Sequence, residues 1–262
     1  MYSQLLGTKI SFLFGAHSED PAVVLDSARR IAAGAKERGL DYEIVAVDDS
    51  GCGRFAKVDA PNTFVLVNDR NHGKGYSLAR ATMFATGTLF LYTDCDLPVN
   101  VFAALDSVGS CNAVLANTLF LGDRTLAESV VLRAVPPSMP RIVTSWLFRT
   151  YVRYRIGTNL GDTQCPLKVI GRRNARALFR DLEIPGYAFD VELVTRARAM
   201  GIDLVSVPVH YHDGRARMSW LKAARHTLRM ARDVQTLPYS LSSSTPRFGT
   251  SRSAGLSKAP KI

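Results

Sequence analysis

Residues 88–96 read TLFLYTDCD, an apolar run that ends in two aspartates separated by one residue. An apolar run of this length predicts a buried β-strand. Asp94 and Asp96 would then lie at the carboxyl end of that strand, where ligands gather in open α/β sheets. Two carboxylates placed there suit Mg²⁺ or Mn²⁺, ions that often connect protein carboxylates to substrate phosphates. Because D-x-D also occurs in surface turns, this assignment depends on what the neighbouring strands carry.

Apolar and amphipathic stretches alternate along most of the chain. Expected strands cover residues 9–16, 42–47, 63–67, 89–93, 113–119 and 204–211, with a loop and a strand within 161–170. Expected helices cover residues 21–38, 75–86, 99–107, 141–156, 172–179, 189–200 and 219–234. Strands that alternate with helices predict a mainly parallel, Rossmann-like sheet flanked by helices. We therefore expect one α/β domain over residues 1–240, with a proline-containing loop at 122–141. The Ser-rich, basic residues 241–262 predict a disordered tail.

The chain of 262 residues carries a formal net charge of +10 at pH 7. A basic surface suits phosphorylated substrates, anionic lipid or nucleic acid. The sequence contains no apolar run of about 18 residues, so no transmembrane helix is expected, and its first residues do not resemble a signal peptide. The four cysteines are far apart and form no C-x-x-C, which favours a reducing cytosol over disulfides or structural zinc. We expect a cytoplasmic protein.

Two acidic or glycine-rich clusters precede the D-x-D. Asp48 and Asp49 end the second expected strand and could bind the base or ribose of a nucleotide, or form a solvated turn. Residues 71–75 (NHGKG) precede a helix; their glycines could let backbone N–H groups approach an anion, and Lys74 could contact a diphosphate. The alternative is a simple glycine turn. Neither G-x-x-x-x-G-K-[ST] nor G-x-G-x-x-G after the first strand is present.

Two acidic clusters follow in the second half. Asp162 and Gln164 follow a glycine-containing loop and either line a site or form a polar turn before a strand. Asp190 and Glu192 begin a helix, and residues two apart on a helix do not face the same way. We therefore expect only one of these two carboxylates to face a cleft.

Histidines and arginines complete the candidates. His210 and His212 alternate along a strand and share a face. They are either partly buried polar residues or metal ligands that act with the carboxylates. Arg215 and Arg217 could each offer paired donors to phosphate oxygens, or belong to a basic loop.

The ordered set of segments is similar to the family-2 glycosyltransferases of the GT-A fold. The similar segments read YEIVAVDDSG (42–51), RNHGKGYSLARATMFATGTLFLYTDCDLPV (70–99), GDTQCPLKVI (161–170), AFDVELVTRARAMGIDLVSVPVHY (188–211) and RARMS (215–219). Within that family the chain most resembles the polyprenyl-phosphate branch, especially the dolichyl-phosphate β-glucosyltransferases. The resemblance implies a nucleotide-sugar donor, expected to be a UDP-sugar, and a divalent cation, Mg²⁺ or Mn²⁺.

The resemblance also implies roles for individual residues. The expected nucleotide-sugar-binding residues are Asp48, Asp49, Lys74, Asp94 and Arg215, and Phe14 at the end of the first expected strand is added to them. The expected metal ligands are Asp94 and Asp96, and His210 is added as a third from the histidine face described above. The expected catalytic residues on the sugar and acceptor side are Asp162, Gln164 and Arg217.

Departures from the family pattern leave the acceptor open. Pro166-Leu167 stands where the family usually has Gly-Phe, and proline fixes φ and removes an N–H donor. Ser50-Gly51 also replaces Gly-Ser. The acceptor is either a polyprenyl phosphate or a soluble hydroxyl compound, and only the hydroxyl would need a general base, for which Asp162 is the first candidate.

The two helices expected at 141–156 and 219–234 mix arginines with aromatic and aliphatic residues. They could lie on an anionic membrane surface or be ordinary amphipathic helices. A basic nucleic-acid-binding protein is a further alternative, although the sequence carries no recognised nucleic-acid motif. A nucleotidyltransferase would need a Gly-rich basic loop after the first strand, which residues 14–19 do not provide.

Overall fold

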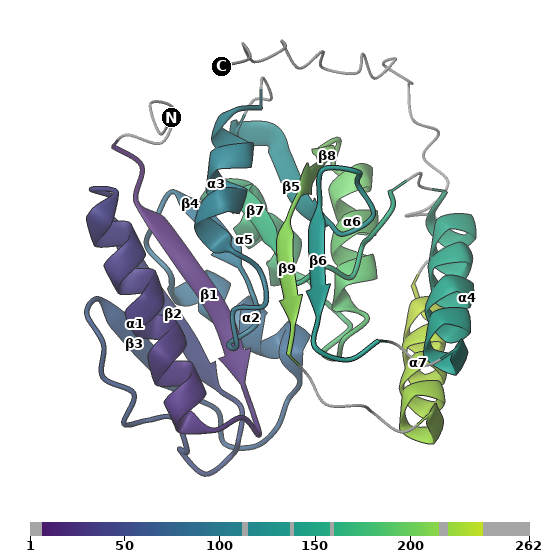
Figure 1. The fold of residues 1–262 in the computed structure, drawn as a ribbon, viewed down its shortest axis with the longest axis horizontal. Coiled ribbons are helices and arrows are strands. Elements are labelled where there is room, and N and C mark those ends of the chain that lie inside the picture. The colour runs from purple at the N-terminus through teal and green to yellow at the C-terminus, as the bar shows by residue number, and fades with distance from the viewer. Residues whose placement is uncertain (1–6, 112–114, 137–138, 158–159, 215–219, 238–262) are drawn as a thin grey trace.

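The computed structural model describes residues 7–111, 115–136, 139–157, 160–214 and 220–237 (Figure 1). A seven-stranded sheet with the order β3-β2-β1-β4-β7-β5-β8 forms its centre. The strands are β1 (Ile10–Ala16), β2 (Tyr42–Asp48), β3 (Thr63–Val67), β4 (Leu89–Tyr92), β5 (Thr118–Asp123), β7 (Lys168–Gly171) and β8 (Asp203–Pro208). All run parallel except β7, which is antiparallel to both of its neighbours, β4 and β5. The predicted mainly parallel sheet is therefore confirmed.

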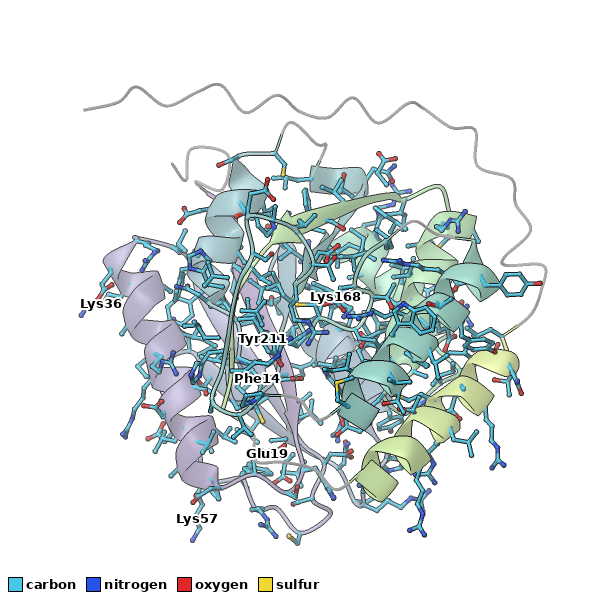
Figure 2. The ribbon with its side chains drawn as sticks, turned by 45° about the vertical axis from the view of Figure 1, so that its right-hand side comes forward. Phe14, Glu19, Lys36, Lys57, Lys168 and Tyr211 are labelled. Carbon is cyan, nitrogen blue, oxygen red and sulfur yellow. The ribbon has the colours of Figure 1, made fainter. Side chains whose placement is uncertain are left out.

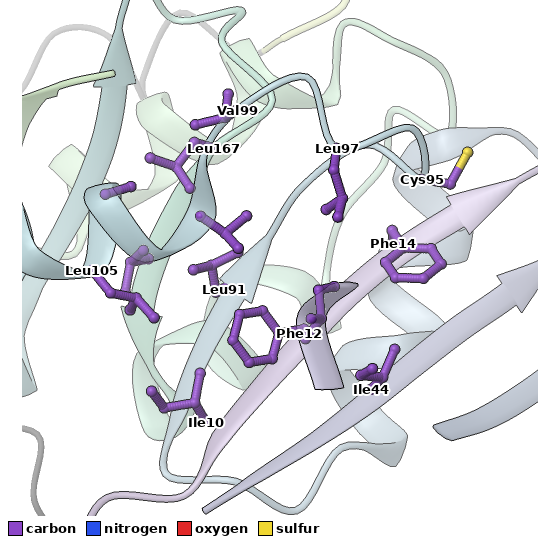
Figure 3. Close-up of a cluster of buried hydrophobic side chains, with 14 of the residues drawn as sticks. Ile10, Phe12, Phe14, Ile44, Leu91, Cys95, Leu97, Val99, Leu105 and Leu167 are labelled. Atoms are coloured by element: carbon purple, nitrogen blue, oxygen red, sulfur yellow. The ribbon is translucent and has the colours of Figure 1, made fainter. Parts of the chain in front are cut away.

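Helices cover both faces of the sheet (Figure 1). On one face lie α1 (Pro21–Glu37) and α3 (Val101–Gly109), which pack with alternate side chains of β1 into one hydrophobic cluster. Figure 3 shows this cluster, with Phe12 of β1 beside Leu91 of β4 and Phe14 farther along β1. On the other face, α2 (Lys74–Phe84), α5 (Arg172–Arg180) and α6 (Phe189–Ala199) pack against the intervening β1 and β2 residues, such as Leu13 and Val45.

Two further helices lie together at one side of the molecule. They are α4 (Met139–Ile156) and α7 (Trp220–Gln235). Phe148 and Val152 of α4 and Met230 and Val234 of α7 join the second hydrophobic cluster. Among the described residues, no helix is both long enough and apolar enough to cross a membrane.

The second half of the chain differs from the sequence expectation. Residues 115–117 form a short 3-10 helix, η1 (Leu115–Asn117), and β5 follows it, so the strand expected at 113–119 begins later. The expected loop at 122–141 contains β6 (Val130–Arg133). The strand expected at 204–211 is two strands, β8 and β9 (His210–Asp213), and β9 pairs with β6 in a separate parallel sheet. Pro208 ends β8 because it has no N–H for the ladder. The expected tail, 241–262, lies outside the described residues.

A buried carboxylate, that of Glu43, connects several segments at the edge of the sheet where the parallel strands begin. Glu43 of β2 is 3% exposed and accepts hydrogen bonds from the Ser11 hydroxyl (2.7 Å), the Thr86 hydroxyl (2.7 Å) and the Gly87 N–H (3.0 Å). The Lys9 ammonium lies 2.9 Å from the carboxylate. Burial alone would raise the pKa of Glu43, but these donors and Lys9 lower it from 4.5 to about 2. Glu43 thereby joins β1 and β2 to the segment that leads into β4.

The lowered pKa of Glu43 predicts a specific loss of stability in acid. The unfolded chain takes up the proton near the ordinary value of 4.5, so this stabilisation is complete above that pH and is lost as the pH falls toward 2. Between about pH 5 and pH 3 the free energy of unfolding should fall by about 1 kcal/mol more in the wild type than in Glu43→Gln, after allowance for screening by solvent. Urea unfolding at both pH values measures this difference, and equal losses in the two proteins would contradict the role of Glu43.

Candidate functional site

The candidate site lies at the edge of the sheet where β1 to β5 end. Because β7 runs in the opposite direction, its first residue meets the same edge. The segments that follow β1, β2, β3, β4 and β5 therefore converge with the segment that precedes β7. In Figure 2, Lys168 at the start of β7 lies near the centre of the view, above Glu19, which follows β1.

Asp48 and Asp49 hold loops in place. Asp48 is fully buried; its Oδ1 accepts hydrogen bonds from the Ser50 N–H (3.0 Å) and hydroxyl (2.5 Å), and its Oδ2 accepts one from the Phe55 N–H (2.7 Å). In this structure both carboxylate oxygens of Asp48 accept hydrogen bonds from its own loop, and contact of Asp48 with a nucleotide stays a prediction. Asp49 is 4% exposed and accepts from the Asn68 side-chain amide at 2.7 Å.

The glycine-rich segment 71–75 donates hydrogen bonds to a carboxylate of the protein itself, that of Asp49. The N–H groups of His72 and Gly73 donate to Asp49 at 2.9 Å and 2.8 Å. In the first turn of α2, the Gly75 N–H donates to the carbonyl of Pro185 at 2.7 Å. These donors are therefore already used within the protein, which favours the simple glycine turn, one of the two alternatives, over a backbone cradle for an external anion.

The two glycines of this segment allow close packing instead. Gly73 has a φ of 98°, and a Cβ there would lie 2.5 Å from the Pro185 carbonyl oxygen. A Cβ on Gly75 would lie 2.5 Å from the Ile184 carbonyl oxygen and 2.8 Å from the Cβ of Phe189. The start of α2 is thus fixed against the segment that leads into α6.

Lys74 and Asp94 form an ion pair at the wall of the site. The ammonium of Lys74 lies 2.6 Å from Oδ1 of Asp94, and the two side chains are 18% and 23% exposed. Burial alone would lower the pKa of Lys74, but Asp94 and Asp190 raise it above its ordinary value. The structure therefore brings together the predicted nucleotide-binding lysine and the first aspartate of the D-x-D.

The D-x-D loop is acidic and open to solvent on one side. Asp96 is exposed, and Cys95 between the two aspartates is buried. Burial raises the pKa of the Cys95 thiol, and the charges of Glu19, Asp96 and Asp94 raise it further. Oxygen donors in this arrangement fit Mg²⁺ or Mn²⁺, because Mg²⁺ usually takes one or two carboxylates and completes its shell with water and substrate phosphates.

His210 does not join these aspartates. Within the described ranges, no three or more His, Cys, Asp or Glu side chains lie close enough together to share a metal ion. Along β9 the Tyr211 ring faces inward, so His210 and His212 face the other way and line a groove of about 540 Å³ with residues of α1, including Arg30. The prediction of His210 as a third metal ligand is therefore wrong for this structure. The sequence predicted that His210 and His212 share a face of the strand, but it could not predict that this face lines the groove beside α1 rather than joining Asp94 and Asp96.

Phe14 lies in the hydrophobic core. Its side chain is fully buried and packs in the cluster beneath α1 and α3 (Figure 3). It occupies this place because alternate residues of β1 face that side of the sheet. The expectation that the Phe14 side chain contacts the donor is corrected.

Asp162 is held as an anion by Arg124, which the sequence analysis missed. The Arg124 Nε and Nη2 groups donate to the two carboxylate oxygens at 2.5 Å and 2.9 Å, and the Gln164 N–H donates at 3.1 Å. Burial alone would raise the pKa of Asp162, but Arg124 lowers it below its ordinary value. The guanidinium also lies 5.0 Å from the centre of the Tyr211 ring. Asp162 is therefore poorly suited to accept a proton and well suited to hold its loop.

Gln164 is placed with an unused donor. Within the part of the chain that the structure describes, its Nε2 group is buried and has no hydrogen-bond partner. A buried donor without a partner costs free energy, and a ligand oxygen would relieve that cost. The two remaining predicted residues, Arg215 and Arg217, lie outside the described residues.

A second buried ion pair lies behind the first. The ammonium of Lys168 is 2.6 Å from Oδ1 of Asp190 and donates to the Cys165 carbonyl at 2.7 Å. Burial raises the pKa of Asp190, although Lys168 and Lys74 oppose the rise. The Phe189 ring centre lies 5.8 Å from the Lys74 ammonium and 5.9 Å from that of Lys168. Sequence reasoning did not select Lys168 as a site residue, although it lies in the segment 161–170 that carries the family resemblance.

Glu192 resolves the choice left open between the two acids of α6. It is fully buried and accepts hydrogen bonds from the N–H groups of Glu183 (2.9 Å) and Ile184 (2.7 Å) and from Arg196 Nε (2.7 Å). Glu192 therefore supports the loop before α6, and Asp190 is the acid that faces the site.

The amino-acid sequence of the chain is similar to those of several curated glycosyltransferases. No protein-family model matches the chain. The chain is 27% identical over 213 residues, 76% of its length, to a dolichyl-phosphate β-glucosyltransferase of Dictyostelium discoideum. It spans less than two thirds of the length of three curated dolichyl-phosphate β-glucosyltransferases, with 63%, 56% and 66% covered.

Solved structures establish the fold. Mannosyl-3-phosphoglycerate synthase from Rubrobacter xylanophilus matches with a TM-score of 0.61 and 19% identity, over 88% of this chain and 74% of that one. Glucosyl-3-phosphoglycerate synthase from Mycobacterium tuberculosis, in complex with Mg²⁺ and uridine diphosphate, matches with a TM-score of 0.57 and 15% identity, over 89% and 82% of the two chains. The chain therefore has the GT-A fold of these glycosyltransferases, and its sequence is similar to those of the dolichyl-phosphate β-glucosyltransferases.

Proposed function

We propose that this chain is a metal-dependent glycosyltransferase that moves a hexose such as glucose from a UDP-sugar to a polyprenyl or dolichyl phosphate. The observation that carries the proposal is the Lys74–Asp94 ion pair beside the exposed Asp96, at the carboxyl edge of a GT-A sheet. A lysine and two carboxylates placed there match the needs of a diphosphate and its cation. A solved protein of the same fold is described with Mg²⁺ and uridine diphosphate, which supports the same ligands here.

Charge develops on the diphosphate as it leaves the sugar, and the site supplies groups to stabilise it. Asp94 and Asp96 would hold the divalent cation, which supplies electrostatic stabilisation of the leaving diphosphate when bound. Lys74 starts α2 at the same wall, and its ammonium would contact the diphosphate. In many enzymes, preorganised charges of this kind provide the largest single contribution to the rate enhancement.

The state of Asp162 favours a phosphate acceptor over a hydroxyl acceptor. A hydroxyl needs a base to remove its proton, whereas a lipid phosphate is already an anion. Both oxygens of Asp162 are used by Arg124, so this carboxylate positions the segment that carries Gln164. The Gln164 Nε2 group would donate to an oxygen of the sugar or of the acceptor. The names of the curated relatives support a dolichyl phosphate.

The surface of α4 supports contact with a membrane. One face of the helix is buried through Phe148 and Val152. Large apolar side chains on the rest of α4 are exposed, with Trp146 at 58% and Met139 at 71%; the others are Ile142, Val143, Leu147 and Tyr154. Contiguous exposed apolar residues mark protein or membrane contact sites, and the basic charge of the chain favours anionic lipid. We propose peripheral contact at the cytoplasmic face of a membrane, which brings the lipid phosphate to the site.

The proposed reaction predicts a product that mass spectrometry identifies. UDP-glucose and other sugar nucleotides are incubated with Mn²⁺, with and without a short polyprenyl phosphate, and we expect a hexosyl phosphoryl polyprenol. In Asp96→Ala, turnover should fall by about 100-fold or more, because one of the two carboxylates that hold the cation is gone. Asp26→Asn, which removes an exposed carboxylate on α1, is the matched control and should retain wild-type turnover.

Two outcomes would contradict different parts of this proposal. Undiminished Mn²⁺-dependent turnover in Asp96→Ala would refute the metal assignment. Transfer to a soluble hydroxyl compound but not to the lipid phosphate would refute the acceptor, and with it the positioning role given to Asp162.

The membrane proposal predicts the behaviour of the chain in flotation with vesicles. Wild-type protein should float with vesicles that contain phosphatidylglycerol, and replacing Trp146 and Leu147 together by Ser should lower the bound fraction several-fold, because apolar area that enters the interface is lost. Val23→Ser removes an apolar side chain on α1 that is 40% exposed and serves as the control. Equal flotation of all three proteins would show that α4 does not contact the membrane.

A further inference from the structure

The Lys74–Asp94 ion pair occupies a carboxylate that the proposed reaction assigns to a metal ion. The ammonium lies 2.6 Å from Oδ1 of Asp94, the distance of a direct ion pair. Both side chains are partly exposed, so the pair lies at the surface of the site, where a ligand can reach it. A lysine and a divalent cation therefore compete for the same oxygen.

The backbone at Lys74 is held on both sides, so only its side chain can respond. The N–H groups of His72 and Gly73 donate to Asp49, and the Gly75 N–H donates to Pro185. A Cβ at either glycine would lie 2.5 Å from a backbone carbonyl oxygen, which shows how closely this turn is packed. The four-carbon stem of lysine is flexible, and the ammonium at its end can be redirected without movement of the helix.

The other acid near Lys74 is already neutralised. Asp190 attracts Lys74 electrostatically, but its Oδ1 lies 2.6 Å from the Lys168 ammonium, which is 1% exposed. Lys168 therefore reduces the competition that Asp190 would otherwise offer, and Asp94 is the carboxylate that pairs directly with Lys74. An ammonium that leaves Asp94 needs a new anion, and a diphosphate bound beside the metal would provide one.

We propose, resting on the proposed function, that Lys74 is an internal substitute cation that couples metal binding to diphosphate binding. A divalent cation that arrives alone has to displace the ammonium from Asp94 and leave it beside a second positive charge. When a nucleoside diphosphate arrives with the metal, the ammonium moves to the diphosphate oxygens and Asp94 is released to the cation. Metal and diphosphate therefore raise each other's affinity by the same factor. The free site is kept from holding the metal tightly without its substrate.

Mn²⁺ binding tests this exchange without any measurement of turnover. Free Mn²⁺ is titrated by electron paramagnetic resonance in wild type, Lys74→Met and Lys74→Gln, with and without uridine diphosphate. Without the nucleotide, both variants should bind Mn²⁺ on the order of tenfold more tightly than wild type, because Asp94 no longer has to release an ammonium. The tightening that uridine diphosphate produces should shrink by on the order of tenfold or more in the same variants. Lys36→Met, an exposed lysine on α1, should match wild type.

The outcomes separate this inference from the proposed function. Equal or weaker binding of Mn²⁺ alone in both Lys74 variants, with near-ultraviolet circular dichroism unchanged, would overturn the exchange while leaving the metal site in place. Mn²⁺ binding to wild type that is equally tight with and without uridine diphosphate would also overturn it. Failure of wild type to bind Mn²⁺ even with the nucleotide would instead remove the proposed function.

Discussion

The buried ion pair between Lys168 and Asp190 joins the two halves of the site. Lys168 begins β7, which runs against both of its neighbours, and Asp190 lies in the first turn of α6. Their charged groups are 2.6 Å apart and almost without solvent. Loss of one partner from such a pair leaves an uncompensated buried charge, which costs about 3–5 kcal/mol. Because β7 is antiparallel, its first residue reaches the edge where the parallel strands end, and the segment 162–167 that precedes it lies at the same edge.

The arrangement of the donor side follows from contacts with the lead-in to α6. Residues 184–189 pack against Gly73 and Gly75, and Glu192 fixes that lead-in through the N–H groups of Glu183 and Ile184. Asp49 holds the other side of the glycine turn. Most of the polar groups near the site thus serve to hold loops in place. Lys74 and Asp94, which are partly exposed, and Asp96, which is exposed, are charged groups of the kind that a metal–diphosphate would need.

The sequence predicted the first half of the fold well because its strands are apolar and its helices have clear ends; Pro21 and Gly39 bracket α1 as expected. It did not predict β6 or β9, since strands of four residues beside prolines carry little pattern and depend on pairing with distant partners. The D-x-D was located by its strand. The sequence could not show that Asp48 and Asp49 hold loops, because a carboxylate that caps a loop has the same sequence appearance as one that binds a ligand. Lys168 was missed because lysines are rarely buried.

The central claim is that a divalent cation held by Asp94 and Asp96 binds the diphosphate of an activated sugar. Crystals grown with uridine diphosphate and Mn²⁺, measured at a wavelength where manganese scatters anomalously, test it most directly. The account predicts one manganese peak in direct contact with the Asp94 and Asp96 carboxylates and with diphosphate oxygens, with the Lys74 ammonium moved from Asp94 to the diphosphate. A nucleotide bound at this edge without manganese, or manganese bound at His210 and His212 instead, would contradict it.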